Sequence, residues 1–137
     1  MSSVADARRW FSQAEADLAA ARTNAGPHPH VGCFLAQQAA EEAMKAAQLA
    51  SGGVVARTHS LSQLQTMLAQ LGVTLEGVRT RALRDLERLN IEARYPDALP
   101  DTTPSEYFTR EDAEEAIAVA VGVVSAAKPF SRNEMDG

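Results

Sequence analysis

Cysteine and long apolar runs are scarce in this sequence, and each scarcity argues against a class of protein. Cys33 is the only cysteine among the 137 residues, so no disulfide can form within the chain. A chain without disulfides suits a reducing compartment, and we expect a cytoplasmic protein. No uncharged segment reaches the roughly 18 residues that cross a bilayer, and residues 1–9 contain no apolar signal core. We therefore predict no membrane contact.

Aromatic residues and strand-like patterns are scarce too. Phe, Trp and Tyr make up 5% of the chain, and no segment of useful length alternates between polar and apolar residues. The chain is instead rich in Ala, Leu and Val; Ala and straight-chain residues lose least conformational freedom on entering a helix. The length suits one domain. We predict an all-α protein, with a helical domain over residues 1–130 and a flexible tail over residues 131–137.

Positive charge is also limited. Lys and Arg total 13 against 18 Asp and Glu, a net charge of −5. Nucleic-acid-binding domains usually carry a basic footprint, so any contact with RNA would have to be local, and RNA binding stays open. The sequence contains no P-loop, dinucleotide fingerprint, zinc-ligand spacing or nucleophile elbow. We expect neither a metal nor a cofactor.

The sequence does contain strong helical periodicity. Apolar residues recur every three or four positions, and Gly- or Pro-containing segments end most of the apolar stretches. The predicted helices span residues 3–24, 30–50, 61–71, 75–93 and 109–128. Short connections predict an up-and-down bundle of four to five helices, with one long polar loop over residues 96–108. Thr109 and Asp112 form an acidic variant of a capping box before the last helix.

The second predicted helix combines a wide apolar surface with one polar stripe. Apolar side chains cover much of its circumference, which predicts a central position in the bundle. Gln37, Glu41, Lys45 and Gln48 share one face at spacings of four, four and three. The simplest interpretation is a solvated stripe with one ion pair, worth some tenths of a kcal/mol. Lys45 is, however, one of only two lysines against eleven arginines, and it lies on the most apolar helix.

Two further residues are candidates for a site. Arg94 ends the fourth predicted helix, beside its apolar stripe, and a guanidinium there could bind phosphate or carboxylate or simply pair with the helix end. His59 precedes the third helix and could be a cap neighbour, stack on a base, bind a phosphate or carry a proton. His28 and His30 make only a weak metal pair. Three arginines between residues 81 and 88 lie among acidic residues, as on an ordinary solvated face.

Three blocks of the sequence together resemble the HEPN domain family. The first is CFLAQQAAEEAMKA over residues 33–46, the second THSL over 58–61, and the third ARYPD over 93–97. Trp10 and DLAAA over residues 17–21 fit the same pattern. The resemblance covers roughly residues 10–124, and three blocks in the right order at the right separations make it fairly specific.

The resemblance implies a helical bundle, frequently a homodimer, with a proposed nucleotide-binding role. Such proteins are often encoded beside a minimal nucleotidyltransferase, as in toxin–antitoxin pairs, which would be the protein partner. The positions carried over as nucleotide-binding candidates are Glu41, Lys45, His59, Arg94 and Tyr95. The roles we assign are phosphate binding for Lys45 and Arg94, with Glu41 holding Lys45. His59 or Tyr95 would lie against a base.

The sequence departs from the HEPN ribonucleases at one motif. Those enzymes carry an Arg followed by four to six residues and a His, whereas no histidine follows Arg94, and Arg57 lies only two residues before His59. The proton-handling histidine is thus missing from its usual place, and we assign no catalytic residue. The alternatives to a nucleotide-binding module are a metal-independent ribonuclease toxin using His59 and Arg94, and a non-catalytic dimerisation scaffold.

Overall fold

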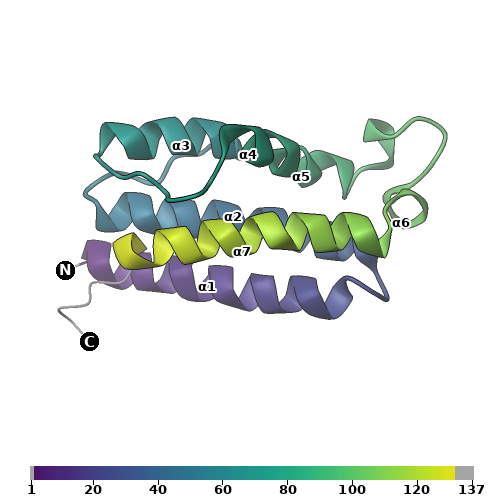
Figure 1. Ribbon diagram of the computed structural model, residues 1–137, viewed down its shortest axis with the longest axis horizontal. Helices are drawn as coiled ribbons and strands as arrows, with labels where there is room; N and C mark the ends of the chain where they lie inside the picture. Colours follow the sequence, from purple (N-terminus) through teal and green to yellow (C-terminus); the bar gives the residue numbers. More distant parts are fainter. Residues whose placement is uncertain (1, 132–137) are drawn as a thin grey trace.

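The computed structural model describes residues 2–131, and these form a bundle of helices without strands. Three long helices build the body: α1 (Ser2–Asn24), α2 (Pro29–Ala50) and α7 (Arg110–Ser131). The shorter α3 (Leu61–Gln70), α4 (Thr80–Glu87) and α5 (Leu89–Glu92) follow one another along one side of this body, and α1 lies along the other side (Figure 1). The predicted all-α bundle is confirmed.

The second helix is central, as its wide apolar surface predicts. α2 packs against both α1 and α7 along its length and also contacts α3 to α6. Its interior residues are mostly alanines, which are fully buried and let neighbouring backbones approach closely. Gly32 marks one such approach: a Cβ there would lie 3.1 Å from the Ala21 carbonyl oxygen and 3.2 Å from the Ala25 Cα. Larger side chains, led by Phe11, Met44 and Leu64, fill the remaining core.

The predicted fourth helix is wrong in its bounds. Helix begins only at Thr80, because Gly77 adopts a positive φ of 75° that ends the preceding turn. The segment then divides at Arg88 into α4 and the four-residue α5. Within residues 96–108, predicted as a loop, lie a short 3-10 helix η1 (Pro96–Ala98) and the single-turn α6 (Pro104–Tyr107). Each begins at a proline, whose fixed φ suits the first helical position.

The last helix begins and ends close to its predicted bounds. Thr109 N–H donates to Asp112 Oδ2 at 2.9 Å, and Asp112 N–H donates to Thr109 Oγ1 at 3.2 Å, so the predicted capping box is present. α7 continues through Pro129 to Ser131, which is buried, so the helix extends past the predicted stop and one residue into the predicted tail. The rest of that tail, residues 132–137, lies outside the described residues. No helix in the described part is long and apolar enough to cross a membrane.

Candidate functional site

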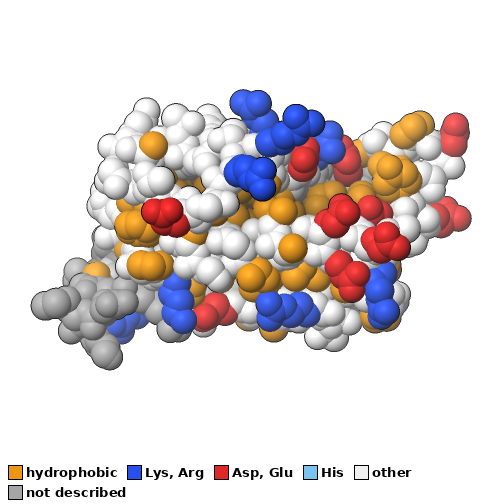
Figure 2. All heavy atoms as spheres, in the orientation of Figure 1, with side chains coloured by type: hydrophobic (Ala, Val, Ile, Leu, Met, Phe, Trp, Pro, Cys, Tyr) orange, Lys and Arg blue, Asp and Glu red, His pale blue; other side chains and the backbone are white. Residues whose placement is uncertain are grey.

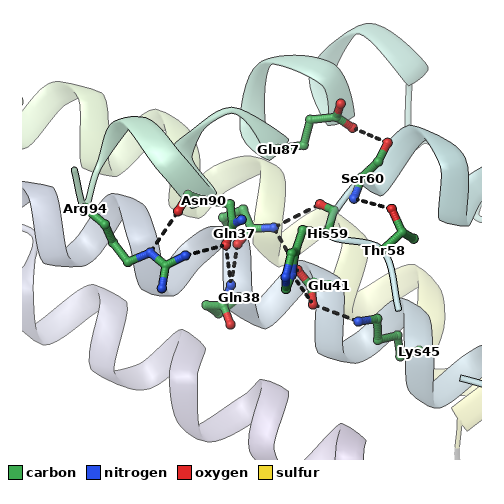
Figure 3. Close-up of polar contacts among 10 residues, drawn as sticks. All are labelled: Gln37, Gln38, Glu41, Lys45, Thr58, His59, Ser60, Glu87, Asn90 and Arg94. Carbon is green, nitrogen blue, oxygen red and sulfur yellow. Dashed lines mark hydrogen bonds and ion pairs between the residues drawn. The ribbon is translucent and has the colours of Figure 1, made fainter. Parts of the chain in front are cut away.

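A buried carboxylate on α2 forms the centre of the candidate site. Glu41 Oε2 accepts from Lys45 Nζ at 2.9 Å, and Glu41 Oε1 accepts from Gln37 Nε2 at 3.1 Å. His59, from the loop before α3, places Nδ1 3.1 and 3.2 Å from the two carboxylate oxygens (Figure 3). The Glu41 side chain is only 6% exposed. A charge so enclosed is stable because its partners replace the lost water.

Lys45 is buried with Glu41 and does not reach outward. Its side chain is 6% exposed, and the ammonium lies 5.8 Å from the centroid of the Trp10 ring on α1. Trp10 thus adds a cation–π contact to the buried ammonium. The predicted solvated stripe is therefore wrong, because all four of its members are buried. The phosphate contact assigned to Lys45 stays a prediction. Lys45 acts as the counter-ion of Glu41.

His59 is the exposed member of this cluster. Its side chain is 61% exposed, although Nδ1 faces the buried carboxylate. Because Nδ1 faces an acceptor, it carries the proton when the ring is neutral, and Nε2 is then a free acceptor. The loop is fixed on both sides of the ring: Gln37 Nε2 donates to the His59 carbonyl at 3.4 Å, and the Ser60 hydroxyl donates to Glu87 of α4 at 3.1 Å. Ser60 also caps α3 through Gln63 N–H.

Arg94 lies in the turn after α5, over the other end of the same face of α2. Its guanidinium carbon lies 4.6 Å from the Phe34 ring centroid and 4.9 Å from that of Tyr95. Nε donates to the Asn90 carbonyl at 2.9 Å and Nη2 to Asn90 Oδ1 at 3.4 Å. A guanidinium has five N–H donors, so three remain available for an anion. Tyr95 is 48% exposed, with one face of its ring toward the guanidinium.

Three amide side chains join the two ends of the site. Gln38 Nε2 donates to Gln37 Oε1 at 2.6 Å and to Asn90 Oδ1 at 3.3 Å. With the bonds above, these contacts make one continuous polar row, which runs Lys45, Glu41, Gln37, Gln38, Asn90 and Arg94 (Figure 3). Phe34, under the guanidinium, and Lys45 are eleven residues apart on α2. At 1.5 Å per residue the row is roughly 16 Å long.

The structure therefore brings the predicted residues together only in part. Lys45 and His59 converge directly on Glu41, whereas Arg94 and Tyr95 lie at the far end of the row. Sequence reasoning placed Gln37 on the polar stripe but did not single out Gln38 or Asn90 as site residues. The available signal was the polar character of Gln38 on a highly apolar helix; nothing local marks Asn90. Gln48, also on the predicted stripe, instead holds the following loop through Ala56 N–H at 3.2 Å.

Glu42, next to Glu41, lies in surroundings that disfavour its ionised form. Burial raises the pKa of Glu42 to about 9, with further increases from a hydrogen bond and charge repulsion with Asp17 and from the charge of Glu41. Glu42 Oε1 is buried without a hydrogen-bond partner in the described structure. Glu42 also lines a hollow of about 320 Å³ beside Arg9, Trp10 and Gln13. At neutral pH this side chain is therefore an uncharged acid, distinct from the paired Glu41.

A second surface feature lies away from the polar row. A groove of about 420 Å³ separates α4 and α5 from α7, and four acidic side chains line it, Asp85, Glu92, Asp112 and Glu115. On this face one group of basic side chains lies over α4 and others lie along α1, with acidic side chains toward the start of α7 (Figure 2). The mixture of basic and acidic side chains agrees with the solvated surface predicted for the arginines of α4. In the groove, the four carboxylates would repel a phosphate, so the groove is unsuitable for one. Among the described residues, no group of three or more potential ligands forms a metal site.

Comparisons with known proteins agree with this architecture. A HEPN domain profile matches residues 7–129. The crystal structure of TT1696 from Thermus thermophilus is 34% identical, with a TM-score of 0.76 over 90% of this chain and 97% of that one. ST0689, an archaeal HEPN homologue, is 32% identical, with a TM-score of 0.70 over 89% of this chain and 94% of that one. No curated protein matches. This chain, with its buried Glu41–Lys45 pair on the central helix, belongs to the HEPN domain family.

Proposed function

We propose that this HEPN domain is a nucleotide-binding module whose polar row receives the phosphate of the ligand. One observation carries the proposal: the exposed side chains of His59 and Arg94 can each donate a hydrogen bond to an anion. Beneath His59, the buried Glu41–Lys45 ion pair is fixed in place. Arg94 contributes unused donors, and a protonated His59 contributes Nε2. Tyr95, exposed beside Arg94, supplies a ring for the base.

This proposal changes the role of one predicted residue. Lys45, buried beside Glu41 and Trp10, positions the carboxylate that orients His59. Of the five residues predicted for the site, His59, Arg94 and Tyr95 are then the ones that face a ligand. The arrangement follows from burial: a charged pair taken out of water is rigid, because leaving either charge unpaired costs several kcal/mol. Because the buried ion pair is rigid, the exposed donor groups above it lose less conformational freedom when a ligand binds.

The partners implied by the resemblance belong to the same proposal. A minimal nucleotidyltransferase would meet the domain as in a toxin–antitoxin pair, and the domain would act as a homodimer in the cytoplasm. Support comes from membership in the HEPN family and from the exposed position of the ligand-facing residues. Co-expression with a nucleotidyltransferase encoded next to this chain, followed by size-exclusion chromatography with light scattering, would test both assemblies.

Calorimetric titration of the purified chain with adenosine nucleotides tests the central proposal. Arg94→Ala removes a charge-assisted contact worth about 1.5–3 kcal/mol, so affinity should fall roughly 10- to 100-fold. His59→Ala should also weaken binding, because it removes a ring that can donate from Nε2 to an anion. Arg22→Ala on α1, an exposed arginine away from the row, is the matched control. Absence of binding by the wild type at millimolar concentrations would contradict the proposal.

A metal-independent ribonuclease is the second candidate, and one observation favours it. The Glu41–His59 contact resembles the carboxylate–histidine pairs that hold a general base, with Nε2 directed away from the carboxylate. Incubation of the chain with RNA in the presence of EDTA tests it. Cleavage that survives chelation and is lost in His59→Ala would support it, whereas intact RNA would exclude it. A scaffold without ligands is the remaining alternative; no nucleotide would then raise the melting temperature.

A further inference from the structure

We infer that Gln38 is a specificity-determining residue of the proposed nucleotide site and that its side-chain oxygen accepts a hydrogen bond from a sugar hydroxyl of the ligand. The inference rests on the proposed function, because it names what the same row recognises besides the phosphate. It is carried by the direction of the hydrogen bonds along the row, which two charged groups determine from opposite ends.

The carboxylate end fixes the first amide. Glu41 can only accept, so Gln37 must turn Nε2 toward it, at 3.1 Å, and a reversed amide would place two oxygens in contact. The same Nε2 also donates to the His59 carbonyl. Gln37 Oε1 therefore points the other way, toward Gln38, and needs a donor there. The Nε2 of Gln38 supplies it at 2.6 Å.

The guanidinium end imposes the same orientation independently. Arg94 can only donate, so Asn90 presents Oδ1 to it, at 3.4 Å. That oxygen also faces Gln38, whose Nε2 lies 3.3 Å away. Both neighbours of Gln38 thus present oxygens to it. Reversing the Gln38 amide would create two oxygen–oxygen contacts at once, so its nitrogen faces the row and its oxygen faces away.

The outward oxygen is open to a ligand. Gln38 is half-buried, and its Oε1 makes no hydrogen bond within the described structure. The one enclosed side-chain oxygen without a partner among the described residues is Glu42 Oε1, so Gln38 Oε1 is accessible to solvent. The surface of the row therefore presents a neutral acceptor between two donors, Arg94 and His59.

The position of this acceptor selects the ligand chemistry. Gln38 is four residues along α2 from Phe34, which lies under Arg94, and three residues before Glu41, which holds His59. Along the helix axis the backbone of Gln38 is thus roughly 6 Å from that of Phe34 and roughly 4.5 Å from that of Glu41. We expect a phosphate held at one of these donors to bring the hydroxyls of its own sugar toward Gln38. A neutral amide oxygen accepts from a hydroxyl without repelling the adjacent phosphate, as a carboxylate would.

Calorimetric titration of the purified chain with three probes tests the inference. The probes are adenosine 5′-monophosphate, its 2′,3′-dideoxy analogue and inorganic phosphate. The wild type should bind the hydroxylated nucleotide about fivefold more tightly than the dideoxy analogue, the effect of one neutral hydrogen bond. Gln38→Met, which keeps the length of the side chain, should abolish that difference. Gln70→Met, at an exposed position on α3, should retain the difference.

Each outcome separates the inference from the proposed function. Equal binding of the two nucleotides by the wild type would overturn the role of Gln38 while the phosphate site stands, and so would persistent discrimination by Gln38→Met. If none of the probes binds at millimolar concentrations, the proposed function fails and the inference fails with it. Should Gln38→Met not fold, as judged by circular dichroism, the wild-type comparison of the two nucleotides decides alone.

Discussion

The same Glu→Gln substitution should have opposite effects at two adjacent positions of α2. Glu41 is a paired carboxylate that holds a buried ammonium, at 2.9 Å from Lys45 Nζ. Glu42 is an uncharged acid in a site that disfavours its ionisation. Glutamine removes the ability to carry negative charge in both cases and keeps the shape of the side chain. Glu42→Gln should therefore stabilise the fold at alkaline pH, and Glu41→Gln should destabilise it.

The size of the expected stability change in Glu42→Gln follows from the raised pKa of Glu42. The pKa of Glu42 rises from 4.5 in the unfolded reference to about 9 in the folded protein. Between these values the unfolded chain releases a proton that the folded chain keeps, so the free energy of unfolding falls as pH rises. One pKa unit corresponds to about 1.4 kcal/mol, and the full shift would give about 6 kcal/mol. Because the side chain is not fully enclosed, water reduces this cost, and we expect Glu42→Gln to gain about 1–3 kcal/mol at pH 8.

The size of the expected stability loss in Glu41→Gln follows from the Lys45 ammonium that is left unpaired. In Glu41→Gln the Lys45 side chain, which is 6% exposed in the native protein, loses its carboxylate partner and keeps the Trp10 ring. Breaking a buried ion pair from one side typically costs about 3–5 kcal/mol. The double variant Glu41→Gln/Lys45→Met should recover part of this loss, because it removes the unpaired charge as well.

Urea unfolding at pH 5 and pH 8, followed by circular dichroism, measures both effects. At pH 5 Glu42→Gln should be nearly as stable as the wild type, because pH 5 lies only half a unit above the unfolded pKa of 4.5 and most of the destabilisation accumulates at higher pH. The gain should appear at pH 8. A Glu42→Gln variant less stable than the wild type at pH 8, or a Glu41→Gln variant within about 0.5 kcal/mol of it, would refute this account of the two glutamates.

Three further predictions concern the core and a helix start. Burial and the charge of Asp112 raise the pKa of the buried Cys33 thiol to about 12. Ellman's reagent at pH 8 should therefore label the native protein only as fast as local unfolding exposes this thiol. Rapid labelling without denaturant would contradict the fold. Thr109→Ala removes one side of the capping box and should lower the free energy of unfolding by about 1 kcal/mol, measured by urea titration. Leu64→Ala opens a cavity at a fully buried position and should cost about 2–5 kcal/mol, whereas Leu71→Ala, 37% exposed, should cost less than about 1 kcal/mol in the same assay.

Most of the helical architecture could be predicted because the signals are local. Apolar periodicity gives α1, α2, α3 and α7 within a few residues, and the Thr109–Asp112 pair identifies the start of α7 from four consecutive positions. The fourth predicted helix fails where local signals conflict. Apolar spacing continues back to Leu75, but Gly77 takes a positive φ and the intervening turn holds Leu75 and Val73 in the core instead. Burial in the folded chain overrides periodicity there.

The candidate site could be predicted only as a set of residues on α2. A spacing of four residues places Glu41 and Lys45 on one face of any helix, so their ion pair follows from the sequence alone. The sequence alone does not determine whether that face is exposed to solvent or buried. The loop that delivers His59, the ring of Trp10 and the turn that carries Arg94 come from distant parts of the chain.

The amino-acid sequence by itself determined which segments are helical, which helix is central and which polar residues share one of its faces, because these depend on neighbours within about one turn. Only the tertiary structure decided that Lys45 is buried and His59 exposed, that Arg94 stacks on Phe34, and that Gln38 and Asn90 join the two ends. These features depend on contacts between residues up to 60 positions apart, as between Phe34 and Arg94, which packing of the whole bundle determines.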